Sequence, residues 1–203
     1  MQTNPHGVAL APSLLSTRGS RALQELALVL AGTLVLYVSA KISVPFYPVP
    51  MTLQTLAVMA IAAAYGQRLG VLTVLAYLGE GLAGLPVFTA TPPAVAGPMY
   101  FLGATGGFLA GFILLALIVG YAADRGWDKS PFRLFGAMVV ADVVVFALGV
   151  TWLAAFAHLG SKTGIGFSAA WANGAVPFLL GDLLKIALAA AAVPAVWALV
   201  GKR

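Results

Sequence analysis

The side chains best suited to chemistry are a few ionisable residues that lie within long apolar segments. Asp182 and Lys185 are three positions apart, so on a helix they share one face. A buried carboxylate and ammonium can form charge-assisted hydrogen bonds to a polar ligand, and such bonds are among the stronger ones in proteins. The pair therefore predicts ligand binding. The alternative is a structural pair that only neutralises itself between packed helices.

Other polar residues lie near the ends of the same apolar segments. Thr52, Gln54 and Thr55 begin one segment, Glu80 lies near the end of the next, and Asn173 precedes the last. Polar and ionisable side chains within a membrane usually face an interior cavity. We therefore expect these residues to converge with Asp182 and Lys185 at one end of a helix bundle.

Three ionisable residues have a second interpretation. Glu80 and Lys41 lie at helix ends, where a long side chain can extend to the membrane surface. For Lys41 we expect this role, whereas for Glu80 both roles stay open. For Asp142, which lies deeper, we expect a hydrogen bond between packed helices.

The sequence contains no catalytic constellation. It has no cysteine, which excludes disulfides, thiol catalysis and cysteine-bound metals. His6 and His158 are its two histidines, and it has neither a His-Glu-x-x-His motif nor a Gly-x-Ser-x-Gly motif. We therefore expect no enzyme activity, no metal and no cofactor.

The composition indicates a membrane protein. Of the 203 residues, 61% are hydrophobic and 8% are charged, against about 25% charged residues in a soluble domain. The net charge of +5 does not indicate nucleic-acid binding, because the basic residues are separated by long apolar runs. The sequence predicts an all-α, polytopic protein that lies in a lipid bilayer.

Six apolar segments are candidate membrane spans. The second and third are shorter than the roughly 20 residues that a bilayer requires, so we expect them to tilt little or to end at protein-lined loops. The segments are 22–42, 51–65, 69–84, 101–123, 132–157 and 175–200.

The basic residues predict the orientation of these spans. Arg68, Arg125 and Lys129 lie in one alternate set of connections, together with both termini, whereas the other set holds Lys41 and Lys162. Cytoplasmic loops carry the Lys and Arg excess, so we expect cytoplasmic N- and C-termini. Residues 1–21 are expected to be a disordered cytoplasmic tail, and residues 22–203 a single six-helix transmembrane domain. The outer connections 44–50 and 84–100 are apolar and rich in proline, and we expect them to lie on the protein as lids.

Four motifs in this order resemble the BioY family, the biotin-specific S components of energy-coupling-factor (ECF) transporters. They are Pro-Val-Pro-Met-Thr-Leu-Gln-Thr at 48–55, Gly-Leu-Pro-Val-Phe at 84–88, Gly-Ala-Thr-Gly-Gly-Phe at 103–108 and Asp-Leu-Leu-Lys at 182–185. The resemblance extends over about residues 22–202. It implies an S-component-like bundle in a bacterial plasma membrane and high-affinity biotin uptake, with the biotin pocket on the outer side. For such a ligand, Tyr77, Phe88, Phe46, Val44 and Leu85 are candidate packing partners, in addition to the polar residues above.

The resemblance also implies protein partners. S components bind a transmembrane coupling (T) component, which carries a pair of ABC ATPase subunits, through an Ala-x-x-x-Ala motif on the first helix. Ala27 and Ala31 match this motif. An S-like component for another vitamin, and an intramembrane enzyme or scaffold, remain the alternatives.

Overall fold

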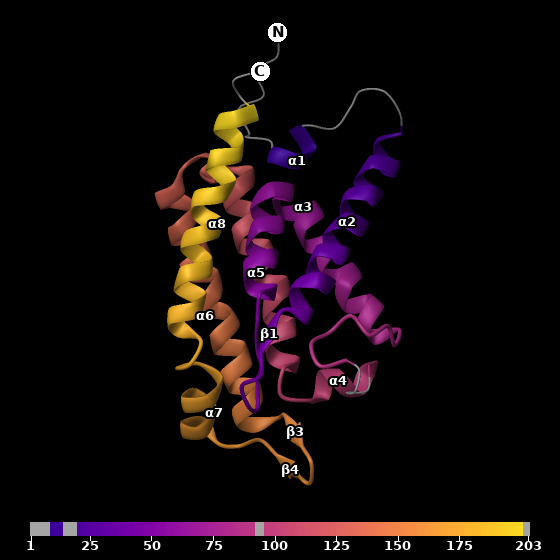
Figure 1. The fold of residues 1–203 in the computed structure, drawn as a ribbon, viewed down its shortest axis with the longest axis vertical. Coiled ribbons are helices and arrows are strands. Elements are labelled where there is room, and N and C mark those ends of the chain that lie inside the picture. Colours follow the sequence, from indigo (N-terminus) through magenta and orange to yellow (C-terminus); the bar gives the residue numbers. More distant parts are fainter. Residues whose placement is uncertain (1–8, 14–19, 92–95, 201–203) are drawn as a thin grey trace.

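The protein is a bundle of long helices whose two ends differ (Figure 1). The computed structural model describes residues 9–13, 20–91 and 96–200. Arg68, Arg125 and Lys129 lie at the end of the bundle where α8 ends, and we call this the basic end. The opposite end holds the short hairpins together with α4 and α7, and we call it the cavity end.

Within the described residues, five helices are long and apolar enough to cross a membrane. These are α2 (Arg21–Lys41), α3 (Gln54–Leu82), α5 (Gly106–Asp124), α6 (Pro131–Ala155) and α8 (Leu179–Val200), whose candidate span is Leu179–Leu199. The other described elements are short: α1 (Leu10–Ser13), β1 (Ser43–Val44), β2 (Met51–Thr52), α4 (Pro98–Leu102), η1 (Trp127–Lys129), β3 (His158–Leu159), β4 (Lys162–Thr163) and α7 (Phe167–Gly174).

The strands form two small antiparallel hairpins that an all-α prediction omits. In β1–β2, Ser43 is opposite Thr52, and in β3–β4, His158 is opposite Thr163. Both hairpins lie at the cavity end. The molecule nevertheless remains a helical protein, as the composition predicts.

The predicted second and third spans form one element, α3, which folds back on itself. Gly66 inside α3 has a non-helical backbone, with φ 77° and ψ −179°. The side chains of Gln54 and Tyr77, 23 positions apart, are joined by a hydrogen bond of 2.9 Å, whereas a straight helix would separate them by about 35 Å. α3 therefore consists of a first arm, 54–65, and an antiparallel second arm, 67–82, which meet at the basic end (Figure 1).

Glycine and a half-buried carboxylate make this reversal possible. The φ of Gly66 lies in a region that side-chain-bearing residues rarely adopt, and a Cβ at this position would lie 2.3 Å from Oδ1 of Asp124. The second oxygen of Asp124 accepts a hydrogen bond from the backbone N–H of Gln67, at 3.1 Å. This bond satisfies a free donor at the start of the second arm.

We expect Gly66→Ala to destabilise the protein by about 1–3 kcal/mol, because alanine resists this φ and collides with Asp124. Thermal unfolding in detergent measures the change. The control is Gly79→Ala in the second arm, where a Cβ has no neighbour within 4 Å, and which should raise stability by up to about 1 kcal/mol. Equal unfolding temperatures for the two variants would contradict this account of the reversal.

The core lies where the long helices meet. Leu36 of α2, Met59 of α3, Leu115 of α5 and Met138 of α6 are fully buried in one cluster with Ile186 of α8. The bulky apolar side chains on the outer faces are exposed instead, as expected of a protein whose solvent is lipid.

Small residues allow α5 and α6 to approach closely at Gly107 and Gly111, which lie four positions apart on α5. A Cβ on Gly107 would lie 2.3 Å from Cβ of Trp152, and one on Gly111 would lie 3.0 Å from Cα of Val145.

Part of the expected disordered tail is folded. Ala9 and Leu10 are buried, and a Cβ at Gly66 would lie 3.1 Å from Cβ of Ala9. Ala9 and the α1 helix that follows it therefore pack against α3, with Ala9 beside the reversal at Gly66. The remainder of the predicted tail, residues 1–8 and 14–19, lies outside the described residues.

Candidate ligand-binding site

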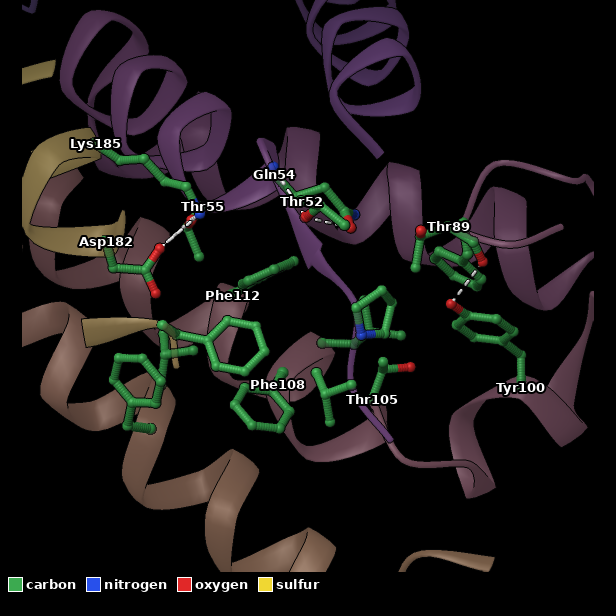
Figure 2. A pocket seen from close by; sticks show the side chains of 17 residues that line it. Thr52, Gln54, Thr55, Thr89, Tyr100, Thr105, Phe108, Phe112, Asp182 and Lys185 are labelled. Carbon is green, nitrogen blue, oxygen red and sulfur yellow. Dashed lines mark hydrogen bonds and ion pairs between the residues drawn. The ribbon is translucent and has the colours of Figure 1, made fainter. Parts of the chain in front are cut away.

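A cavity with about 580 Å³ of unfilled space, part of it open to solvent, lies at the cavity end of the bundle (Figure 2). The wall is mostly apolar: Phe108, Leu109 and Phe112 come from α5, Val145 and Phe146 from α6, and Phe178 from the turn before α8. Val49, Pro50, Phe88 and Thr89 line it from the connections predicted to be lids.

Asp182 and Lys185 form a buried ion pair in the cavity wall. Lys185 Nζ lies 2.7 Å from Asp182 Oδ1, and the two residues are 7% and 4% exposed respectively. Thr55 joins them, because its hydroxyl accepts from Lys185 at 3.1 Å and donates to Asp182 at 3.0 Å. Asp182 also lies in the first turn of α8, where the helix dipole favours a negative charge.

This ion pair leaves one acceptor available. Both contacts to Asp182 end on Oδ1, and no described residue donates to Oδ2. In Figure 2 the second carboxylate oxygen of Asp182 points toward the aromatic side chains of the cavity. The pair is neutral as a whole, so the site offers a strong acceptor without an unbalanced charge.

A second polar group comes from the start of α3. Gln54 is 4% exposed, and its amide donates to the Tyr77 hydroxyl, which in turn donates to the carbonyl of Val87 at 2.9 Å. Thr52 donates to the Gln54 amide oxygen at 3.2 Å. An amide nitrogen has two donors, so one N–H of Gln54 remains for a ligand.

Aromatic rings close the side of the cavity near α4. Phe88 is stacked on Tyr100 with ring centroids 4.7 Å apart, and it meets Tyr77 and Phe101 edge-on at 5.4 and 5.3 Å. Tyr100 donates to the carbonyl of Thr89 at 2.9 Å. These contacts hold the 84–91 connection against the bundle.

The structure brings five of the residues predicted from the sequence into the cavity lining: Thr52, Gln54, Phe88, Asp182 and Lys185. Two more lie beside it. Tyr77 is buried behind Gln54, and Phe46 packs edge-on against Phe178 at 6.0 Å.

Four predicted residues lie outside the cavity. Glu80 and Leu85 line a separate surface depression next to Tyr37 of α2, because Glu80 lies on the side of the second arm that faces α2. Asn173 is exposed and donates to the carbonyl of Ala169 in its own helix. Val44 is exposed on β1.

The remaining wall residues were only weakly indicated by the sequence. Phe108 and Thr55 belong to two of the motifs noted above. Phe112, Val145 and Phe146 are apolar residues in apolar helices, and no sequence pattern distinguishes them from residues that face lipid. Asp142 was expected to form a hydrogen bond between packed helices. Its Oδ1 is buried and has no hydrogen-bond partner among the described residues.

A multi-pass helical bundle with a mostly apolar, loop-covered cavity and a buried ion pair defines a membrane-embedded small-molecule-binding protein. A model of the BioY family matches residues 11–202, and the chain belongs to this family.

Comparisons with individual proteins agree with this assignment. The chain is 37% identical to the biotin transporter BioY of Thermotoga maritima over 160 residues, which are 78% of this chain and 86% of the relative. It is 33% identical to the probable biotin transporter BioY of Pyrococcus horikoshii over 166 residues, 82% and 91% of the two chains. The fold matches the crystal structure of the S-component for biotin from an ECF-type ABC transporter, with a TM-score of 0.71, 22% identity, and coverage of 89% of this chain and 94% of that one.

Proposed function

We propose that this chain is the biotin-binding S component of an ECF-type ABC transporter and mediates biotin uptake, with no reaction catalysed by the chain itself. The observation that carries the proposal is 37% identity to a biotin transporter across most of both chains. The cavity supports it, because a mostly apolar pocket with a few polar groups suits the thioether ring, the ureido ring and the aliphatic tail of biotin.

We infer that the ion pair binds the ureido end of biotin. The ureido ring is neutral and carries N–H donors, so it can use the open oxygen of Asp182 without disturbing the bond from Lys185. A ligand carboxylate at the same place would be repelled by Asp182. Gln54 or Thr55 can contact the other polar edge of the ring.

The carboxylate end is then placed toward the mouth of the cavity. Among the described lining residues, Lys185 is the single cation, and it is already paired. A carboxylate near the loops keeps its hydration, whereas burial would require a partner charge.

A binding isotherm on detergent-purified protein tests the function. We expect saturable binding of one biotin per chain. Biotinamide, whose carboxylate is blocked, should bind within about tenfold of biotin, whereas an analogue acylated at one ureido nitrogen should lose about 100-fold or more, since it loses a donor and adds bulk.

The binding results test the proposed function and the proposed orientation of biotin separately. No saturable biotin binding refutes the function, and saturable binding of a different vitamin identifies an S-like component for that ligand. If biotin binds but the ranking of the two analogues is reversed, the orientation in the cavity is wrong and the function stands.

We further propose that the two arms of α3 are separate crossings, which makes six in a single transmembrane domain over residues 22–203. Arg68, Arg125 and Lys129 lie at the basic end together with the start of α2 and the end of α8. By the positive-inside rule this end is cytoplasmic. The cavity then opens to the outer side of a bacterial plasma membrane.

The partners are proposed to be a transmembrane T component and a pair of ABC ATPases. Ala27 and Ala31 lie on α2 with exposed side chains one turn apart, and α2 is the least covered of the five long helices. This small-residue surface permits close approach of a partner helix.

A further inference from the structure

The ammonium of Lys41 is bound by the backbone of the 84–91 connection. Lys41 is the last residue of α2, and its Nζ donates to the carbonyls of Pro86 and Phe88, each at 2.7 Å. It also donates to the carbonyl of Thr91 and, at 3.3 Å, to the Thr91 hydroxyl. Lys41 is exposed at the end of α2, and these backbone partners were not predicted from the sequence.

The connection curls around this ammonium. Ala90 has φ 57°, a left-handed conformation that is uncommon for a residue with a side chain. The Thr91 hydroxyl donates to the carbonyl of Phe88 at 2.6 Å. Carbonyls from three residues thus converge on one point, where an ammonium with three donors can satisfy them.

The same connection forms part of the cavity wall. Phe88 and Thr89 line the cavity, and they lie between the carbonyls that Lys41 binds. The ammonium contacts no cavity-lining side chain through these bonds, so its effect on a ligand acts through the backbone of the connection.

We propose that Lys41 is a positioning residue, a latch from α2 that holds residues 86–91 against the cavity and thereby limits the escape of bound ligand. This inference rests on the proposed function, because the ligand is taken to be biotin. Without the ammonium, three carbonyls lose a common partner, and the left-handed turn at Ala90 loses the contacts that hold it.

The test compares Lys41→Met, which retains the length of the side chain but removes the charge, with Lys41→Arg and the unchanged protein. We expect Lys41→Met to raise the dissociation rate of biotin about 30-fold and to change the association rate by less than about threefold, since related complexes differ mainly in dissociation. Lys41→Arg should recover part of the loss. The matched control is Lys162→Met, on exposed β4 at the same end of the bundle, and it should behave as the unchanged protein.

A second measurement does not depend on biotin. In the ligand-free Lys41→Met protein, amide exchange at Val87 and Thr91 should accelerate about tenfold or more, because the N–H groups of both are bonded within this connection. Exchange at Leu115 in the core should not change.

The two proposals fail in different ways. If the unchanged protein shows no saturable biotin binding, the proposed function fails, and amide exchange still decides whether Lys41 orders the connection. If biotin binds and Lys41→Met alters neither its dissociation nor the exchange of Val87 and Thr91, the latch is refuted. Faster exchange without faster dissociation also overturns it, since Lys41 would then be purely structural.

Discussion

Asp182→Ala and Lys185→Ala are each expected to weaken biotin binding about 30-fold or more, which corresponds to about 2 kcal/mol. Each change removes one member of a buried ion pair with a 2.7 Å contact. The remaining charge stays in a largely water-free wall without its partner, and in the case of Asp182 the open acceptor for the ligand is lost as well. Equilibrium binding to detergent-purified protein measures both effects.

Two further variants distinguish the loss of a ligand contact from the effect of an unpaired buried charge. The double variant Asp182→Ala, Lys185→Ala should lose less than the two single losses added together, because it leaves no unpaired charge. Glu80→Ala is the control, since Glu80 lies in a separate depression, and its affinity should stay within about threefold of the unchanged protein. If both single variants bind biotin normally, the ion pair is a structural element between helices.

The double variant Ala27→Trp, Ala31→Trp is expected to abolish co-purification with the T component, while biotin affinity changes by less than about threefold, or ~0.7 kcal/mol. Both alanines are exposed on α2, and two indole rings would prevent the close approach of a partner helix. Ala27 and the cavity lie toward opposite ends of the bundle, so the ligand site should remain intact.

The chain contains a matched control for steric bulk in the membrane. Ala187 and Ala191 have the same spacing and are also exposed, but they lie on α8. The variant Ala187→Trp, Ala191→Trp should assemble normally. Normal assembly and transport by the α2 variant would show that the coupling surface is elsewhere; loss of assembly by both variants would indicate a general effect of tryptophan on the bundle.

Local spacing predicted the parts of the site that one helix determines alone. Asp182 and Lys185 share a face because of helical geometry, and Thr52 and Gln54 enter the site together because they are neighbours at the junction of β2 and α3. The second and third spans were predicted as separate short helices, and the structure joins them at a single non-helical glycine, Gly66.

Other parts depend on how whole helices are rotated against one another, which spacing does not encode. Glu80 lies three residues beyond Tyr77, yet it faces the α2 side whereas Tyr77 faces Gln54. Lys41 is at a helix end, where extension to the surface is the usual expectation, but a connection 45 to 50 positions further along the chain supplies its partners. Contacts of this range follow from the tertiary fold.

The short first arm of α3 also determines how far a molecule in the cavity is from the opposite membrane surface. The arm spans about 18 Å at ~1.5 Å per residue, and its first residues line the cavity, whereas the hydrocarbon layer is about 30 Å thick. In the proposed arrangement of six crossings, with Gly66 at the cytoplasmic surface, Gln54 and Thr55 lie about 18 Å from that surface and therefore within the hydrocarbon layer.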